Sequence, residues 1–242
     1  MPTKAAAKKP NTYRAHRDRQ RRRILDAAWK LFDEQGIDRV TMAEITLASG
    51  LQPSTMYQYF SNKDDIVWAI LSEIFEETTA RAKQSAEGAS TGLARITALL
   101  NFTADELEKH RPRVRFMAQF DAMYAHYWPV ETLLTLEAQF NPQGLQYFTN
   151  LIREGIADGS LRADLDPDLT MHAVVNAVIG AQRRLASLGS KVEQEYGQPI
   201  DRLFRETIRV ILLGLRAAET PAANKPSPRR KPVKNTSRKR TS

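Results

Sequence analysis

The sequence predicts an all-α fold in which a small N-terminal domain precedes a larger helical domain. Three observations support this prediction. Apolar residues recur at intervals of three and four along most of the chain, as they do on one face of an α-helix. Glycine and proline divide these stretches into segments of ordinary helix length. No run of alternating apolar and polar residues flanks a hairpin dipeptide, so we expect no strands.

The positive charge of the chain is concentrated at its two ends. The 242 residues carry a net charge of +8 at pH 7. Residues 1–23 contribute +8 and residues 219–242 contribute +7, which leaves −7 on the body between them. We expect residues 1–13 to be a disordered basic arm and residues 219–242 a disordered basic tail. Such ends suggest a polyanionic partner such as nucleic acid, although solvated tails that only aid solubility have the same composition.

Composition and motifs exclude several classes of protein. The chain has no cysteine, which excludes disulfides, thiolate metal sites and a cysteine nucleophile and fits a reducing compartment. No apolar run reaches the roughly 18 residues of a membrane span, so we expect a soluble, cytoplasmic protein without a membrane partner. The phosphate-binding and nucleophile motifs of common enzymes are missing, and no Glu-x-x-His pair could hold a di-iron centre. We therefore expect no catalytic residue, no metal site and no cofactor.

The first expected helix spans residues 17–35 and ends at Gly36. The apolar residues that define its buried face are Ile24, Ala28, Leu31 and Phe32. A short helix over residues 42–48 should follow. Thr41 is placed to cap it, and Glu44 stands three residues later, which is the spacing of a capping box.

A second short helix is predicted from Pro53 to about Tyr59, after a tight turn at Gly50. Two short helices joined in this way form a helix-turn-helix, whose second helix can enter the major groove of DNA. The residues expected to form its core are Ile45, Ala48, Leu51, Met56 and Phe60. The polar side chains left near the start or on the outer face of the second helix are Ser54, Thr55, Tyr57, Gln58 and Tyr59. Hydroxyl and amide groups of this kind bind base edges and phosphate oxygens.

The helices of the larger domain are predicted from the same signals. Ile66, Ile70 and Ile74 define one that starts at Ser61, which is expected to cap it. The further expected helices span residues 91–109, 113–127, 130–140, 143–158, 167–188 and 200–218. Pro112 should separate the first two of these. Asp166 followed by Pro167 is a typical helix start.

Residues 20–66 resemble the DNA-binding domain of TetR-type transcriptional regulators. The match is carried by "ILDAAWKLFDEQGIDRVTMAEITLASGLQPSTMYQYFSNKDDI". The sequence departs from that family's pattern at Thr46 and Ser49, where small alanines are usual, and at Gln52, where serine is common. The resemblance implies a three-helix DNA-binding domain, here residues 14–64, and a larger effector-binding and dimerisation domain, here residues 65–218.

The resemblance also implies a function and a set of contacts. It implies a bacterial, nucleoid-associated repressor that acts as a homodimer and responds to an effector. Two-fold symmetry would then require a pseudo-palindromic operator, and the aromatic residues named below indicate that the effector is small and largely apolar. Carried over by position, the residues that hold the phosphate backbone are Thr41, Tyr57, Tyr59 and Lys63. Those that face bases are Ser54, Thr55 and Gln58. We further hypothesise that Arg14 and Arg17 extend into the minor groove or along phosphates.

Candidate effector contacts lie on two of the later helices. The aromatic residues of one helical stripe, Phe116, Phe120, Tyr124, Tyr127 and the adjoining Trp128, either line an apolar cavity or form ordinary core. His172 and Asn176 lie one turn apart among valines and either bind the effector or form a satisfied core pair. The resemblance implies that the last two helices pair with their mates in a four-helix dimer interface.

One alternative function fits the charge pattern. A sequence-tolerant, architectural DNA-binding protein could be driven by the basic ends alone. Such a protein would show a steep dependence of affinity on salt and little discrimination between DNA sequences. The predicted helix-turn-helix favours the regulator over this alternative.

Overall fold

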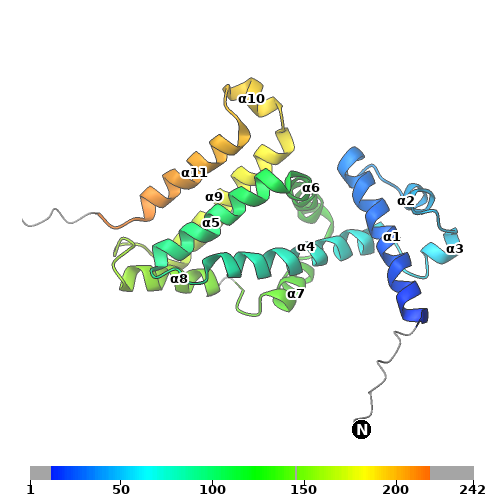
Figure 1. The fold of residues 1–242 in the computed structure, drawn as a ribbon, viewed down its shortest axis with the longest axis horizontal. Helices are drawn as coiled ribbons and strands as arrows, with labels where there is room; N and C mark the ends of the chain where they lie inside the picture. Colours follow the sequence, from blue (N-terminus) through cyan, green and yellow to red (C-terminus); the bar gives the residue numbers. More distant parts are fainter. Residues whose placement is uncertain (1–11, 145, 219–242) are drawn as a thin grey trace, which may run out of the picture.

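The computed structural model describes residues 12–144 and 146–218. Within these ranges the chain forms eleven α-helices, and the only extended pairing is an isolated antiparallel bridge between Leu161 and Arg216. The predicted all-α class is therefore confirmed. Figure 1 shows a small group of helices, α1 to α3, at one end of the molecule and a larger group at the other, with α4 running from one to the other.

The N-terminal part contains α1 (Thr12–Gln35), α2 (Met42–Ser49), α3 (Pro53–Met56) and the start of α4 (Lys63–Ala86). α1 begins before the predicted position, so the last residues of the expected arm are helical. Residues 1–11 and the expected basic tail, residues 219–242, lie outside the described ranges. α4 runs without a break across residues 64 and 65, where the domain boundary was expected.

The start of α2 has the predicted capping box. The Glu44 amide donates to the Thr41 hydroxyl at 3.3 Å, and the Thr41 amide donates to a Glu44 carboxylate oxygen at 2.8 Å. Gly50 ends the helix with φ +64°, a left-handed conformation that a residue with a Cβ adopts only under strain.

Two predicted helix bounds in this region are wrong. α3 ends at Met56 and not at Tyr59, because the amides of Gln58 and Tyr59 bond to carbonyls three residues back, at 3.1 and 3.0 Å. Asn62, not Ser61, caps α4: its side-chain oxygen accepts from the Asp65 amide at 2.9 Å. An asparagine directly before the helix satisfies one of the free amides of the first turn.

The C-terminal part contains the remaining seven helices of the described ranges. They are α5 (Gly92–Lys109), α6 (Arg111–Tyr127), α7 (Val130–Phe140), α8 (Gln146–Ala157), α9 (Pro167–Leu188), α10 (Lys191–Tyr196) and α11 (Ile200–Leu215). The bounds of α7 and α9 agree with the prediction, and Asp166 caps α9 as expected. α10 was not predicted. Pro112 lies in the first turn of α6, where a missing amide hydrogen has no consequence, and not between the two helices.

Two separate hydrophobic clusters hold these parts together. The N-terminal core consists of buried side chains of α1 to α4 together with Phe116 and Phe120 of α6. The C-terminal core consists of buried side chains of α5, α8, α9, α10 and α11, with Ala86 of α4 and Val114 of α6. α4 and α6 contribute to both clusters and therefore link them. No helix in the described ranges is long and apolar enough to span a membrane.

Candidate nucleic-acid interface

The reading head, residues 41–63, exposes the polar side chains that were predicted to meet DNA. Ser54, Tyr57 and Gln58 are exposed, with 58% of Tyr57 accessible, while Thr55 and Tyr59 are half-buried. The opposite side of the same segment is anchored by Met56 and Phe60, which are 0% and 6% exposed. A short helix that is anchored in the core on its inner face and is polar on its outer face can enter a major groove.

Two of the predicted phosphate contacts are already hydrogen bonded within the protein. The Lys63 ammonium donates to the carbonyl oxygens of Ile37 at 2.8 Å and Asp38 at 3.2 Å, in the segment between α1 and α2. The Thr41 hydroxyl donates to Glu44 at 2.7 Å and accepts from the Glu44 amide. These bonds from Thr41 lower the pKa of Glu44, so its carboxylate stays ionised. Both side chains therefore support the reading head itself.

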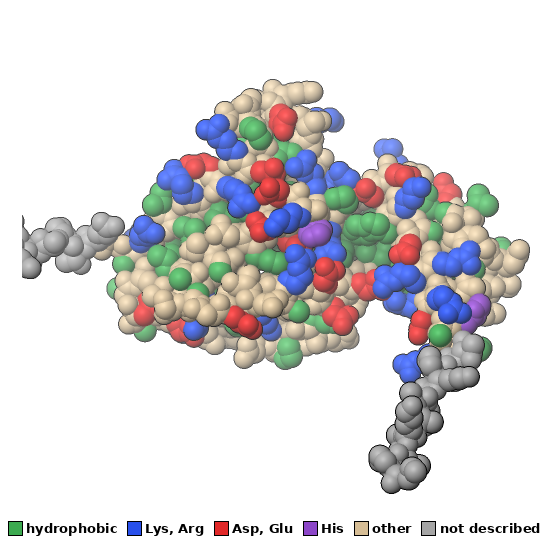
Figure 2. Space-filling view, in the orientation of Figure 1, with side chains coloured by type: hydrophobic (Ala, Val, Ile, Leu, Met, Phe, Trp, Pro, Cys, Tyr) green, Lys and Arg blue, Asp and Glu red, His purple; other side chains and the backbone are tan. Residues whose placement is uncertain are grey.

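Arginines of α1 continue the same surface. The guanidinium of Arg17 lies over the ring of Tyr59 at 5.8 Å, and that of Arg21 lies over Phe60 at 5.8 Å. Arg14 stands one turn before Arg17 and is exposed. Figure 2 shows that Lys and Arg side chains are numerous on the visible face of the N-terminal part. Arg14 and Arg17 thus stand on a helix beside the reading head and do not form an extended arm.

The predicted effector residues of α6 pack mainly into the N-terminal core. The ring of Phe116 lies 5.5 Å from Trp29 of α1, and that of Phe120 lies 5.2 Å from Trp68 of α4. Trp128, whose ring lies 5.4 Å from Phe120, donates its indole N–H to Asp64 at 3.1 Å. This aromatic group fastens α6 to α1 and α4.

The other predicted effector residues lie apart from this group. Tyr124 is half-buried and stacks on Phe120 at 5.9 Å, whereas Tyr127 is 72% exposed. His172 and Asn176 lie on the exposed face of α9, where the Asn176 amide donates to the His172 carbonyl at 2.9 Å. The structure therefore does not bring the seven residues together around one cavity. The sequence predicted an aromatic stripe on this helix. It gave no indication of which other helices would pack against that stripe.

An exposed apolar surface, here termed the α9–α11 face, runs along the last two long helices. Its exposed members are Leu169, Ala173, Ala177 and Gly180 of α9, with Val210, Leu213 and Gly214 of α11. Leu169, Val210 and Leu213 are 69%, 57% and 53% exposed. Apolar side chains gathered on one exposed face are typical of a protein–protein interface.

Comparison with known proteins agrees with this geometry. Residues 24–70 match the sequence profile of "Bacterial regulatory proteins, tetR family". The transcriptional repressor KstR2 of Mycolicibacterium smegmatis is 25% identical over 150 residues, which cover 62% of this chain and 71% of that protein. KstR2 of Rhodococcus jostii is 22% identical over 196 residues, or 81% of this chain and 91% of that protein.

Solved structures share the fold across most of the chain. The ketosteroid transcriptional regulator KstR2 of Mycobacterium tuberculosis superposes with a TM-score of 0.61 at 20% identity, covering 82% of this chain and 96% of that one. FadR of Bacillus subtilis, solved with stearoyl-CoA, gives 0.60 at 18% identity, with coverages of 79% and 97%. Profile, relatives and fold agree with the helix-turn-helix described above. Residues 24–70 are therefore similar in sequence to the DNA-binding domain of bacterial regulatory proteins of the tetR family, and most of the chain shares the fold of such regulators.

Proposed function

We propose that the protein is a ligand-responsive transcriptional repressor that binds a pseudo-palindromic operator as a homodimer. The observation that carries the proposal is the reading head, whose polar outer face is held in place by Met56 and Phe60. The relatives named above are repressors of the same family. Such a protein would act in the bacterial cytoplasm, at the nucleoid.

The proposed contacts divide into two kinds. Ser54, Thr55 and Gln58 read base edges in the major groove. Thr41, Tyr57, Tyr59 and Lys63 hold phosphates, which fixes the register of the reading head on the duplex. Arg14 and Arg17 add phosphate contacts from α1, because the Arg17 side chain already lies against Tyr59. These arginines raise affinity for any duplex and steepen its dependence on salt.

The dimer is proposed to form through the α9–α11 face. A two-fold axis there would place two reading heads on one side of the assembly, and they would meet two half-sites of opposite orientation. His172 and Asn176 lie on this face and would then contact the partner subunit, which is a different role from the predicted effector contact.

A small, largely apolar effector is proposed to release the DNA. FadR of Bacillus subtilis was solved with stearoyl-CoA and a Saccharomonospora viridis regulator with choline, so effectors within this fold differ widely. In this chain Tyr124 and Trp128 remain only half-buried beside Phe120, at the end of α6. An effector that favours one position of α6 would shift the reading head, since Phe116 and Phe120 tie α6 to α1 and α4.

The test is the binding of the full chain to duplexes from the DNA upstream of its gene, compared with unrelated duplexes of equal length. Specific binding should exceed non-specific binding by at least about 10³-fold at physiological salt. Gln58→Ala should remove much of this ratio, whereas Gln84→Ala, an equally exposed glutamine far from the reading head on α4, should leave it unchanged. Equal binding to all duplexes, lost on removal of residues 1–11 and 219–242, would favour the architectural alternative.

A further inference from the structure

The middle of α4 has fewer hydrophobic contacts than its two ends. Ile66, Val67, Ile70, Leu71 and Ile74 are buried in the N-terminal core, and Ala86 is buried in the C-terminal core. None of the residues between Ile74 and Ala86 is fully buried, and the apolar contacts of this stretch come from the partly buried Phe75 and Ala82. Hydrophobic packing is therefore strongest at the two ends of the helix that links the two cores and weaker in its middle.

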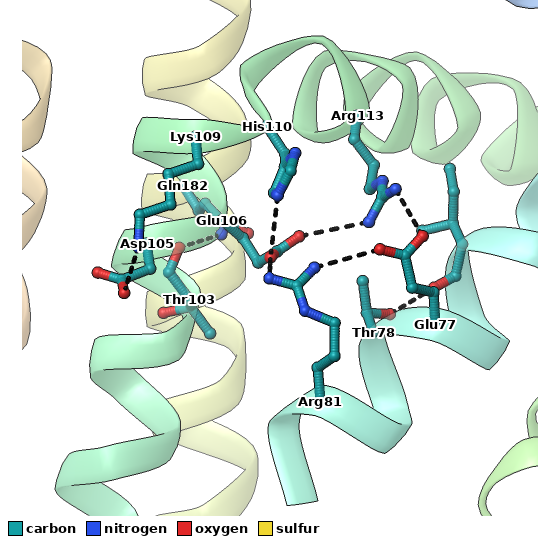
Figure 3. Close-up of polar contacts among 11 residues, drawn as sticks. Glu77, Thr78, Arg81, Thr103, Asp105, Glu106, Lys109, His110, Arg113 and Gln182 are labelled. Atoms are coloured by element: carbon teal, nitrogen blue, oxygen red, sulfur yellow. Dashed lines mark hydrogen bonds and ion pairs between the residues drawn. The ribbon is translucent and has the colours of Figure 1, made fainter. Parts of the chain in front are cut away.

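A buried carboxylate occupies this position. The side chain of Glu106 on α5 is only 7% exposed, and its oxygens lie 2.9 Å from Arg81 Nη2 of α4 and 3.6 Å from Arg113 Nη1 of α6. Figure 3 shows Arg81 and Arg113 reaching Glu106 from two different helices. An ionised carboxylate is this deeply buried only when it is paired, so Glu106 binds α4 and α6 to α5.

Glu77 of α4 completes this polar joint, which consists of Glu77, Arg81, Glu106 and Arg113. Arg113 donates to Glu77 at 2.8 Å, and Arg81 lies 3.3 Å from it (Figure 3). Neither oxygen of Glu106 has a partner in hydrogen-bond alignment, although both are buried. Buried ion pairs of this quality add little net stability, but they can specify one arrangement of the helices that carry them.

The joint connects to α1 through the neighbouring turn of α4, and Arg21 of α1 lies over Phe60 of the reading head. Glu73 lies 3.0 Å from Arg21 and 2.9 Å from Arg22, both on α1. A cleft of about 630 Å³ adjoins these pairs, and its walls include Arg22, Glu73, Glu77 and Arg113. Figure 2 shows positive and negative side chains alternating over the middle of the molecule, between its two parts. The ion pairs at the edge of this cleft hold α1 against α4.

We propose that Glu106 is a positioning residue that sets the angle of α4, and with it the placement of the reading head, through Arg81 and Arg113. This proposal rests on the proposed function, because the property it controls is operator binding. Loss of the Glu106 charge leaves both hydrophobic cores intact but lets α4 take several angles. The two reading heads of a dimer would then match the spacing of two half-sites for only part of the time.

The first test compares Glu106→Gln with Glu108→Gln in the full chain. Glu108 is an exposed glutamate on the same helix that pairs with Arg205 at 2.7 Å, so it controls for the loss of one charge. The probe is a duplex that the wild-type protein selects from random-sequence DNA. Glu106→Gln should weaken binding to it by roughly tenfold, an ordinary coupling effect, while Glu108→Gln has no effect. Binding of unrelated duplexes should not change, because the DNA-facing charges remain.

A second variant removes the charges without leaving one unpaired. Arg81→Met combined with Glu106→Leu replaces the pair by apolar side chains of similar size, which often preserves stability. It should keep the wild-type melting temperature and show the same roughly tenfold loss of specific binding. Wild-type binding by this folded variant would overturn the proposal. The proposal would also be overturned if the loss of DNA binding in Glu106→Gln were fully explained by the fraction of that variant that is unfolded.

Tryptophan emission gives a readout that needs no DNA. Trp29, Trp68 and Trp128 are the three tryptophans of the chain, and all pack against the N-terminal core near α4. Trp68 of α4 lies 5.2 Å from the ring of Phe120 of α6, so a change in the angle of α4 alters its surroundings. The emission spectrum should therefore change in Glu106→Gln and in the paired variant but not in Glu108→Gln. Unchanged emission in both Glu106 variants would contradict the proposal. If the wild-type protein selects no duplex from random-sequence DNA, the proposed function is wrong. The tryptophan emission of the variants then still tests whether Glu106 positions α4.

Discussion

Several polar residues of the reading head form hydrogen bonds that stabilise the protein in the absence of DNA. Thr41 and Glu44 cap the start of α2, and Lys63 joins the start of α4 to the segment between α1 and α2. The resemblance to TetR-type regulators predicts phosphate contacts for Thr41 and Lys63. The geometry adds that each also satisfies backbone groups, so substitutions at these positions should change stability as well as DNA affinity.

Thr41→Ala should lower the free energy of unfolding by about 1 kcal/mol, because the first turn of α2 loses its cap. Urea denaturation at fixed protein concentration measures this value. Thr41→Ser keeps the hydroxyl and should retain most of the stability. Equal losses for both substitutions would show that the threonine methyl group, and not the cap, is what matters.

Lys63→Met should also destabilise the free protein, by about 1 kcal/mol. The ammonium donates to two carbonyl oxygens. Hydrogen bonds from a charged donor usually contribute more than about 1 kcal/mol, but this side chain is half-exposed, and solvent screening reduces the contribution. Urea denaturation without DNA is again the measurement, with Lys191→Met at an exposed lysine of α10 as the control. Unchanged stability in Lys63→Met would mean that the lysine serves only the phosphate.

At the scale of helices, the sequence predicts where a helix starts better than it predicts which other helices it packs against. Asp166 followed by Pro167 located α9, and Thr41 with Glu44 located α2, because capping depends on groups a few residues apart. The end of α3 was not predictable in this way. The turn after it is tight, and Met56 and Phe60 are both buried in the N-terminal core. The position of that core depends on the other helices and cannot be seen in the local sequence.

The aromatic stripe of α6 illustrates the same limit for the candidate site. Phe116 and Phe120 of this stripe are buried, whereas Tyr127 is 72% exposed. The choice between a cavity lining and a packed core depends on Trp29 and Trp68, which lie far away in the sequence. α10 was missed for a different reason, since a six-residue helix is too short to show a period.

The crossing of α5 and α8 depends on two glycines and gives a prediction at this scale. A Cβ on Gly92 would lie 2.3 Å from the Gly155 amide nitrogen, whereas a Cβ on Gly155 would meet the side chain of Leu161 at 2.6 Å. Gly92→Ala should therefore force the helices apart and destabilise the fold by roughly 1–3 kcal/mol. Gly155→Ala should be less harmful because a side chain can move. Thermal unfolding of both variants tests this order, which the reverse ranking would refute.

The whole molecule consists of two cores that share α4 and α6. Buried aromatic rings connect α6 to α1, while the polar joint around Glu106 connects α4 to α5 and α6. The first connection is hydrophobic and close-packed, and the second is charged and incompletely hydrogen bonded. The C-terminal part is therefore connected to the N-terminal part both by packed aromatic rings and by charged side chains.

The proposed dimer is the property of the whole molecule on which the proposed operator recognition depends. Val210→Glu and Leu213→Glu place a charge on the α9–α11 face, at residues that are 57% and 53% exposed in the single chain. Each variant should fold normally yet become monomeric, because a carboxylate would have to be buried against the partner subunit. Leu134→Glu on α7 is the matched control, since that leucine is 55% exposed but lies on another helix. Sedimentation analysis distinguishes the two states. Variants that stay dimeric would locate the interface elsewhere, whereas monomers with weakened operator binding would show that paired reading heads supply the affinity.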